Sequence, residues 1–437
     1  MPLPATQKPI LIIGAGISGL LLAQHLRKLG GPDKIPFRIF ERDADLTTRG
    51  LGWGLTLHWS LPALRALLPE ELLARLPEAY VDQKAVEEGR ASRFPFFDLS
   101  TGELKASTPD LPESARIRVT RDRFRRLLAT GLEIEWGKAL ISFQTLEDGS
   151  VQVQFNDGTT VEGRLLVACD GGSSRVRNAL FPGVPKYQVP VRMMGVRIDC
   201  DPEEIDPIRK LDAFFLQGAA SQNDSFVYCS ILDAPGNINN TTGKYTCQIC
   251  VSWPIRPGFF GSSEPIDFPT TSREGVALIK KFANTWAEPF RSLAQRIPDE
   301  TEVKCLQLAD WPPPRGLRTQ GSVALVGDAM HPMVMYRGEG ANHAIIDVHD
   351  FVELVLPILL PGPSSSTGIQ NPALTLREAL NQYEDRVIAR TRPAVLASRQ
   401  ACLDAHEWSR IDEKSPLLTK RDMWVKFDEE SMMLRVS

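Results

Sequence analysis

The chain has 437 residues, 43% of them hydrophobic and 24% charged, which are the proportions of an ordinary globular protein. This length exceeds what one hydrophobic core usually serves, so we expect about two domains. A formal net charge of -4 provides no basic field for nucleic acid or for an anionic membrane surface. Seven scattered cysteines indicate reduced thiols in the cytoplasm, and no apolar run resembles a signal peptide or a membrane span.

The first segment, residues 9–42, reads as strand, turn, helix and strand. Residues 10–13 form an apolar run of the kind that a buried parallel strand requires. The turn GAGISG follows at once, and leucines then recur at helical spacing. The second strand, 37–40, ends at Glu41 and Arg42. This order of elements predicts the start of a Rossmann-like fold.

Each glycine of that turn has a physical reason. Gly14 makes the tight turn, Gly16 lets a pyrophosphate approach the backbone, and Gly19 lets the helix lie close to the strand. The start of the helix offers free N–H groups to the phosphates. Glu41 would accept hydrogen bonds from an adenosine ribose. The motif therefore predicts a dinucleotide, and by itself it leaves FAD and NAD open.

The pattern of predicted helices and strands changes in the middle of the chain. We expect helices over 60–80 and 121–130, and antiparallel strands over 133–168 with a turn at 156–158. Between 185 and 310 strand candidates follow one another without alternating helices, and one helix is expected at 273–297. This pattern predicts a mixed sheet in a second domain.

After residue 320 the pattern returns to strand, loop and helix, then to a flexible loop at 361–372 and a helical tail at 373–411. The expected fold is therefore α/β, with a mixed β-sheet substrate domain and a long C-terminal helix beside the Rossmann-like domain. The expected boundaries are 1–184 and 311–361 for the Rossmann-like domain, 185–310 for the substrate domain, and 373–437 for the C-terminal helical segment.

Two further apolar strands end in a glycine–acid pair. Asp170 precedes Gly171, and Asp328 follows Gly327 in VGDAMHPMVMYRGEGANHAIID, residues 326–347. A surface turn would explain an acid, a proline and glycines between a strand and a helix. Close approach of the backbone to a ligand would explain them as well, because glycine lacks the side chain that would block it.

Four motifs in this order resemble those of the class A flavoprotein monooxygenases, the para-hydroxybenzoate-hydroxylase-like group. They are GAGISG with Glu41, Arg121 in VTRDRFRRLL, CDGGSSRVR, and GDAMHP followed by GEGAN. The resemblance spans nearly the whole chain. It implies FAD, transient NAD(P)H without a Rossmann domain of its own, and O2, with oxygen transfer from a flavin C4a-hydroperoxide to an aromatic or polyketide-like small molecule.

The same resemblance implies roles for the motif residues. Asp328 would bind the ribityl chain, and Arg121 would reach the adenine end of FAD. Asp170 would lie near the pyrophosphate and the nicotinamide. A helix N-terminus stabilises negative charge on reduced flavin. The implied cofactor set is Gly14, Gly16, Gly19, Glu41, Arg42, Gly54, Arg121, Asp170, Asp328, Gly340, Ala341 and Asn342.

The chain also departs from the family pattern. Val334 and Met335 stand where many members carry proline beside the reacting edge of the flavin. His58 could act as a general base or be structural, and we expect His331 to shape the turn at Asp328. No H-x-x-x-H pattern or acidic cluster argues for a metal. Cys247 and Cys250, three apart on a strand candidate, should face opposite sides of the sheet and form no redox pair.

The catalytic candidates are Arg197 and Tyr228, on neighbouring strand candidates. In related phenol hydroxylases an arginine and a tyrosine on such strands hold the substrate oxygen. The alternative is that Arg197 lies at the sheet surface and Tyr228 belongs to the core.

Other functions remain open at this level. Epoxidation, Baeyer–Villiger insertion and dearomatisation use the same flavin chemistry. A halogenase is a further alternative, but its W-x-W-x-I-P element is absent. A flavin-binding redox sensor without turnover is the alternative outside enzymes. The pattern does not determine an oligomeric state.

Overall fold

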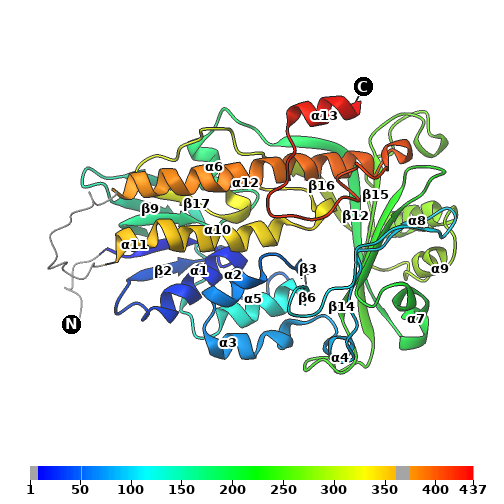
Figure 1. The fold of residues 1–437 in the computed structure, drawn as a ribbon, viewed down its shortest axis with the longest axis horizontal. Helices are drawn as coiled ribbons and strands as arrows, with labels where there is room; N and C mark the ends of the chain where they lie inside the picture. Colours follow the sequence, from blue (N-terminus) through cyan, green and yellow to red (C-terminus); the bar gives the residue numbers. More distant parts are fainter. Residues whose placement is uncertain (1–7, 51, 361–374, 437) are drawn as a thin grey trace.

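Two large sheets stand at opposite ends of the molecule, and the long helix α12 (Leu376–Asp404) runs between them (Figure 1). This computed structural model describes residues 8–50, 52–360 and 375–436. The predicted loop at 361–372 lies outside the described residues. No helix in the described ranges is long and apolar enough to cross a membrane.

The first sheet has five strands in the order β17-β11-β1-β2-β7, and every neighbouring pair is parallel. Residues of β1 and β11 are buried throughout, which matches strands covered by helices on both faces. Carboxyl ends of parallel strands meet at one edge, so this edge collects the three glycine-containing turns. The strands are β1 (Ile10–Ile13), β2 (Phe37–Phe40), β7 (Ile134–Glu135), β11 (Leu165–Ala168) and β17 (Val323–Leu325).

Helices cover this sheet, and two smaller sheets lie beside it (Figure 1). The predicted turn at 156–158 joins β9 to β10, as expected. The helices are α1 (Ile17–Lys28), α2 (Leu61–Leu67), α3 (Glu70–Ala74), α5 (Arg121–Ala129), α6 (Arg175–Leu180), α10 (Gly340–Leu354) and α11 (Leu356–Leu359). The smaller sheets contain β8 (Leu140–Thr145), β9 (Val151–Phe155) and β10 (Thr160–Gly163), and β3 (Gly54–Leu57) with β6 (Ile117–Thr120).

The second sheet has seven strands in the order β16-β12-β15-β14-β13-β4-β5. Its strands are β4 (Phe96–Asp98), β5 (Leu104–Ala106), β12 (Tyr187–Cys200), β13 (Phe215–Ala219), β14 (Phe226–Asp233), β15 (Tyr245–Pro254) and β16 (Lys304–Asp310). The helices α7 (Pro202–Leu211), α8 (Ser272–Ala283) and α9 (Phe290–Gln295) lie on its outer side (Figure 1). The α/β fold class is thus confirmed. Strands β4 and β5 come from within the segment 1–184, so the substrate sheet draws on more of the chain than 185–310.

Prolines divide two of the predicted helices. The helix expected over 60–80 ends before Pro69 and resumes as α3 and the 3-10 turn η1 (Leu76–Ala79). The helix expected over 273–297 is divided into α8 and α9 around Pro289. The helix α12 starts at a Thr375–Glu378 capping box and continues through Pro393.

The inner and outer faces of the substrate sheet belong to different hydrophobic clusters. Cys247 lies in the cluster under α8 and α9, whereas Cys250 lies in the cluster that faces α12. The two thiols therefore point to opposite faces, as expected. The inner face, with Met193 and Phe226, meets the first domain, and a large cavity lies at this junction.

The remaining short elements connect these layers. They are α4 (Gln83–Glu87), the 3-10 turns η2 (Phe259–Gly261), η3 (Gly327–Ala329), η4 (Met335–Arg337) and η5 (Trp408–Arg410), and the C-terminal α13 (Glu429–Val436).

Candidate active site

One cavity of about 590 Å³ runs from the glycine turn after β1 to the inner face of the substrate sheet. We call its two parts the glycine end, beside Gly14, Glu41 and Asp170, and the sheet end, beside Tyr228 and Gln248. Of the fourteen candidate site residues, eleven line this cavity: Gly14, Gly16, Glu41, Arg42, Gly54, Arg121, Asp170, Asp328, Gly340, Ala341 and Tyr228.

The three glycines of the first turn differ in what surrounds them. Gly14 has a φ of +108°, and a Cβ there would lie 2.3 Å from the carbonyl oxygen of Cys169. A Cβ on Gly19 would lie 2.1 Å from the carbonyl oxygen of Gly14, so this glycine permits the helix to lie against the turn. Around Gly16 no atom of the described residues beyond its own helix and chain neighbours lies within 4 Å of that position. The first and third glycines serve the fold, and the second leaves room in the cavity.

Glu41 is held in place by the backbone. Its Oε2 accepts a hydrogen bond from the Ala15 amide at 2.8 Å, and its Oε1 accepts one from the Asp43 amide at 3.1 Å. The guanidinium groups of Arg49 and Arg125 lie 3.4 and 3.6 Å from the carboxylate. This side chain is therefore fixed and charge-compensated at the wall of the glycine end.

Two helix starts face the cavity without a side-chain cap. Neither Gly16 before α1 nor Glu339 before α10 caps its helix with a side-chain hydrogen bond. The first N–H groups of a helix have no partner within the helix, so both starts offer donors and the positive end of a dipole. An anionic or electron-rich ligand group fits beside each of them.

Asn342 does not line the cavity. Its Oδ1 accepts hydrogen bonds from the His58 amide at 3.0 Å and from the Ser60 hydroxyl at 2.8 Å, and its Nδ2 donates to the Thr56 carbonyl at 2.9 Å. These bonds tie the start of α10 to the end of β3. The side chain therefore positions the helix start, which the sequence alone did not indicate.

Two carboxylates face the glycine end. Asp170 accepts a hydrogen bond from the Arg175 amide at 2.8 Å through Oδ2, while its buried Oδ1 has no partner among the described residues. Asp328 presents its side chain to the cavity and is accessible to solvent there. Burial raises the pKa of both acids. Ligand hydroxyl groups would satisfy these oxygens.

A buried network holds the turn at Asp328. Asp347 accepts hydrogen bonds from the Gly327 amide at 2.7 Å and from Arg390 at 2.7 Å, and His331 lies 2.6 Å from the same carboxylate. Burial alone would raise the pKa of Asp347, but the charges of His331 and Arg390 lower it below its ordinary range. His331 therefore shapes the turn, as expected.

At the sheet end an arginine and a tyrosine are paired. Arg118 donates through Nη2 to the Tyr228 hydroxyl and through Nη1 to the Thr56 hydroxyl at 2.7 Å. Burial raises the pKa of Tyr228, and the charge of Arg118 opposes this rise. Gly54 makes room for the pair, because a Cβ there would lie 2.3 Å from Nη2 of Arg118.

Arg197 does not join Tyr228, and its predicted role as a substrate-holding residue is not supported. It is exposed, it is not among the residues that line the cavity, and it reaches toward the loop at Gly50. The register explains this position. Arg197 lies two residues beyond Gly195, where Trp53 covers β12, and so falls toward the rim of the sheet.

The sequence analysis missed a number of cavity residues, among them Phe94, Arg118, Gln217, Gln248 and Arg421. Arg118 belongs to β6, which pairs with β3 so that Arg118 lies opposite Thr56. A pairing across that sequence separation leaves no local pattern. The one available signal was the alternation in ARIRVTR, which puts Arg116 and Arg118 on one face of a strand next to Arg121.

The structure also places His58 and Met335, two other residues that the sequence analysis singled out. His58 is buried, does not line the cavity, and has a pKa lowered to about 3 by burial and by Arg116, Arg421 and Arg337. It is neutral at physiological pH and is not placed to act as a base. Met335 does line the cavity and is 43% exposed.

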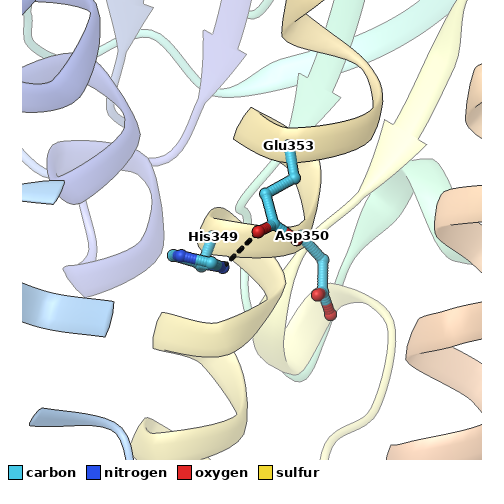
Figure 2. Close-up of side chains that lie close together, drawn as sticks. All are labelled: His349, Asp350 and Glu353. Carbon is cyan, nitrogen blue, oxygen red and sulfur yellow. Dashed lines mark ion pairs between the residues drawn. The ribbon is translucent and has the colours of Figure 1, made fainter. Parts of the chain in front are cut away.

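His349, Asp350 and Glu353 come close together on α10, as Figure 2 shows, with an ion pair between His349 and Glu353. Asp350 is already paired with Arg390 at 3.0 Å, and Glu353 with Arg386 at 2.8 Å. The carboxylates are therefore neutralised by arginines, and the group is explained as an ion-pair network on the helix.

Comparison with known proteins settles the family. A family model described as FAD binding domain matches residues 7–227. A probable FAD-dependent monooxygenase of Arthroderma benhamiae is 42% identical over 98% of this chain and 99% of its own length. The chain belongs to the FAD-dependent monooxygenases.

Other comparisons agree. The FAD-dependent monooxygenase tazP of Aspergillus terreus is 35% identical over 80% of this chain and 89% of its own length. The structure of 2,6-dihydroxypyridine-3-hydroxylase from Arthrobacter nicotinovorans has a TM-score of 0.70 and 19% identity, and the match covers 98% of this chain and 99% of that one. The relatives support an enzyme, and the structure shows the same fold. The redox-sensor alternative loses its basis.

Proposed function

We propose that this FAD-dependent monooxygenase uses NAD(P)H and O2 to oxygenate an aromatic or polyketide-like small molecule. The observation that carries the proposal is the single cavity, which joins a glycine end suited to a dinucleotide with a sheet end that holds an arginine and a tyrosine. When bound, FAD supplies the redox and oxygen chemistry. The protein supplies position, charge and a water-excluding wall.

The glycine end fits FAD on three counts. The space at Gly16 admits a pyrophosphate against the start of α1, and Glu41 stands at the end of β2 for the adenosine ribose. The unpartnered oxygen of Asp170 and the cavity-facing carboxylate of Asp328 would accept hydrogen bonds from hydroxyl groups of the cofactor. Gly340 and Ala341 would offer N–H groups to the flavin from the start of α10.

Arg121 completes this set. Its guanidinium lines the cavity, and burial lowers its pKa, opposed by the nearby charges of Asp328 and Asp43. An arginine in this position would meet a negatively charged part of the cofactor.

At the sheet end Tyr228 and Arg118 would hold a hydroxyl oxygen of the substrate ring. Arg118 donates to the tyrosine oxygen, which leaves the Tyr228 proton free to point at the substrate. The positive charge beside it favours the ionised form of a substrate hydroxyl. An ionised hydroxyl makes the ring richer in electrons and more reactive toward an electrophilic oxygen. Arg118 therefore takes the role that Arg197 was expected to have.

Apart from Gln217 and Gln248, the walls around this pair are mainly aromatic and apolar. Phe94, Phe215, Phe226 and Tyr336 line the cavity beside Val334. Such walls suit a flat, hydrophobic ring and exclude water from the reacting atoms. This composition favours an aromatic substrate over a small polar one.

The test is a screen of phenolic and polycyclic aromatic compounds against the FAD-loaded protein. Oxidation of NADPH and of NADH is followed optically, and product mass is measured in the same wells. We expect at least one compound to accelerate nicotinamide oxidation and to gain about 16 mass units, the mass of one oxygen atom. On the general stoichiometry of a monooxygenase, roughly one molecule of oxygenated product should form per nicotinamide cofactor oxidised. Oxidation that no compound stimulates, with no oxygenated product, would contradict the proposal.

A further inference from the structure

A second arginine faces the sheet end of the cavity. Arg421 belongs to the segment between α12 and α13, which turns back across the molecule in Figure 1. Its side chain lines the same cavity as Arg118 and Tyr228. The C-terminal segment therefore supplies part of the substrate chamber.

The segment that carries Arg421 is held by hydrogen bonds from the buried Arg337. Arg337 donates to the Pro416 carbonyl, to the Thr419 hydroxyl at 3.1 Å and to the Lys420 carbonyl at 3.1 Å. Arg337 is itself paired with Glu339 at 2.7 Å, next to the start of α10. Because Arg337 is buried and bonds three residues just before Arg421, Arg421 has a defined place in the cavity wall.

Two arginines bracket a pair of aromatic rings. The Arg421 guanidinium carbon lies 4.9 Å from the centre of the Phe94 ring, and the Arg118 guanidinium carbon lies 4.9 Å from that of Phe215. The two rings meet edge to face, with centres 4.8 Å apart. Phe94 has a φ of +50°, which costs energy for a bulky residue. Within the cavity lining the order is therefore cation, ring, ring, cation. Arg116, whose guanidinium carbon lies 4.5 Å from the centre of the Phe94 ring, is outside that lining.

Arg421 has no carboxylate partner among the described residues. Its guanidinium donates to the Leu417 carbonyl at 3.1 Å and to the Thr419 carbonyl at 3.4 Å, and its buried Nε has no partner. Burial and the charge of Arg337 lower the pKa of Arg421 to about 9, so the group is still charged at pH 7. The nearby Glu339 is already paired with Arg337.

Arg421 is partly buried. A partly buried cation without a carboxylate partner is costly, and an anion beside it offsets the cost. The planar fork of a guanidinium matches a carboxylate, with which it can form two parallel hydrogen bonds. A substrate hydroxyl held by Arg118 and Tyr228 would not serve Arg421, because Arg421 lies beyond the rings of Phe94 and Phe215. Arg421 would then still have no anionic partner. A ligand that satisfies both arginines needs a second charged group.

We propose that Arg421 binds a carboxylate on the substrate, so that the enzyme takes acidic aromatic compounds whose reacting ring lies at Arg118 and Tyr228. This inference rests on the proposed function for the position of that ring. It narrows the substrate class from aromatic compounds in general to aromatic acids.

The test uses three pairs of probes that differ in charge and hardly in shape. They are 2-hydroxybenzoate, 3-hydroxy-2-naphthoate and anthraquinone-2-carboxylate, each with its primary amide. Binding to the FAD-loaded protein is measured by calorimetry at pH 7. We expect the wild type to bind at least one acid about tenfold or more tightly than its amide, as a charged hydrogen bond allows. No acid preference in any pair, including no binding at all, overturns the proposal.

Variants then assign the preference to this residue. Arg421→Met should abolish the preference for the acid over its amide, and Arg421→Lys should keep part of this preference. Lys420→Met is the matched control, because it removes a charge from the neighbouring residue, whose side chain is 86% exposed. It should leave the preference unchanged. An acid preference that survives in Arg421→Met, or disappears in Lys420→Met, contradicts the assignment.

Two further measurements separate a binding role from a structural one. If Arg421 is there for a ligand, Arg421→Met should keep its FAD content and melt no lower than the wild type without ligand, because it removes a partly buried charge that has no carboxylate partner among the described residues. A lower melting temperature would favour a structural role and contradict the proposal. Calorimetry does not depend on turnover, so failure of nicotinamide oxidation would refute the proposed function while leaving the acid preference to stand or fall by itself.

Discussion

The two ends of the cavity are lined by different kinds of chemical group. At the glycine end the ligand-facing groups are mainly backbone amides and the spaces left by missing side chains, and the carboxylates Asp170 and Asp328 stand beside them. At the sheet end they are side chains from distant segments, with Arg118 on β6, Tyr228 on β14 and Arg421 near the C-terminus. The first end is shaped by the fold itself, and the second can change by single side chains while the fold stays the same.

This contrast predicts that the two ends respond separately to mutation. Changes at the glycine end should affect folding or FAD binding. Changes at the sheet end should affect the use of the substrate and leave the FAD content alone. Four sets of variants test this separation.

The largest effect is expected for Gly14→Ala. The added Cβ would lie 2.3 Å from the Cys169 carbonyl oxygen, in a backbone conformation with φ of +108°. We expect a loss of at least about 2 kcal/mol of unfolding free energy, or no soluble protein. Gly16→Ala, where no atom lies within 4 Å, should fold normally and lose FAD affinity instead. Urea unfolding and FAD titration of both variants provide the measurement, and equal stability of the two would contradict this account.

Asp328→Asn should separate FAD binding from stability. We expect FAD affinity to fall about tenfold or more, because a charged acceptor for hydroxyl groups is lost. Without FAD the variant should be at least as stable as the wild type at pH 7. Both quantities are measured on protein stripped of FAD.

The pH dependence follows from the raised pKa of Asp328. The folded protein holds this proton more tightly than the unfolded chain, so stability falls as pH rises from the ordinary value of 3.8 through the raised pKa. The Asp328→Asn substitution removes this loss of stability, because asparagine does not ionise. The stability advantage of the variant should therefore be present at pH 7 and disappear in acid below 3.8. An advantage that grows toward acid would show that the shift has the opposite sign.

The sheet end is tested by Tyr228→Phe, with Arg197→Gln as the control. We expect Tyr228→Phe to lower product formed per NADPH oxidised about tenfold, since it loses a hydrogen bond to an ionised oxygen. FAD content should stay at the wild-type level. Arg197 is exposed and outside the cavity lining, so its variant should behave as the wild type. Impaired coupling in Arg197→Gln would reinstate the original assignment.

The smallest effect is expected for Met335→Pro, which introduces the proline that the family resemblance led us to expect there. Val334 has φ of -70° and ψ of 158°, which suits a residue before proline, and Met335 opens a 3-10 turn. We expect a change in unfolding free energy of no more than about 1 kcal/mol, in the stabilising direction. Strong destabilisation, measured by thermal unfolding, would show that the Met335 amide has a partner that proline cannot replace.

The contrast between the ends also decides what the sequence could predict. The glycine turn, Glu41, Asp170 and Asp328 were found because each lies where a short apolar strand ends, and the physical reason is local. The fold class was found for the same reason, since buried parallel strands and strand-rich stretches have different patterns. Domain boundaries were less accurate, because β4 and β5 join the substrate sheet from within the first segment.

The sheet end depends on register and on long-range pairing. Arg197 and Arg118 are both strand arginines, and only the pairing of β6 with β3 puts Arg118 beside Tyr228. Arg421 follows a helix by many residues and reaches the cavity through a bond network centred on Arg337. Neither position leaves a periodic signal in the sequence.

The most direct test of two separable ends is the flavin-to-protein ratio of purified Arg118→Met and Asp328→Asn, measured side by side from their absorption spectra. The account predicts a wild-type ratio for Arg118→Met, whose side chain serves the sheet end, and a clearly lower ratio for Asp328→Asn. Loss of flavin from Arg118→Met, with the ratio of Asp328→Asn unchanged, would contradict the division of the cavity into a cofactor end and a substrate end.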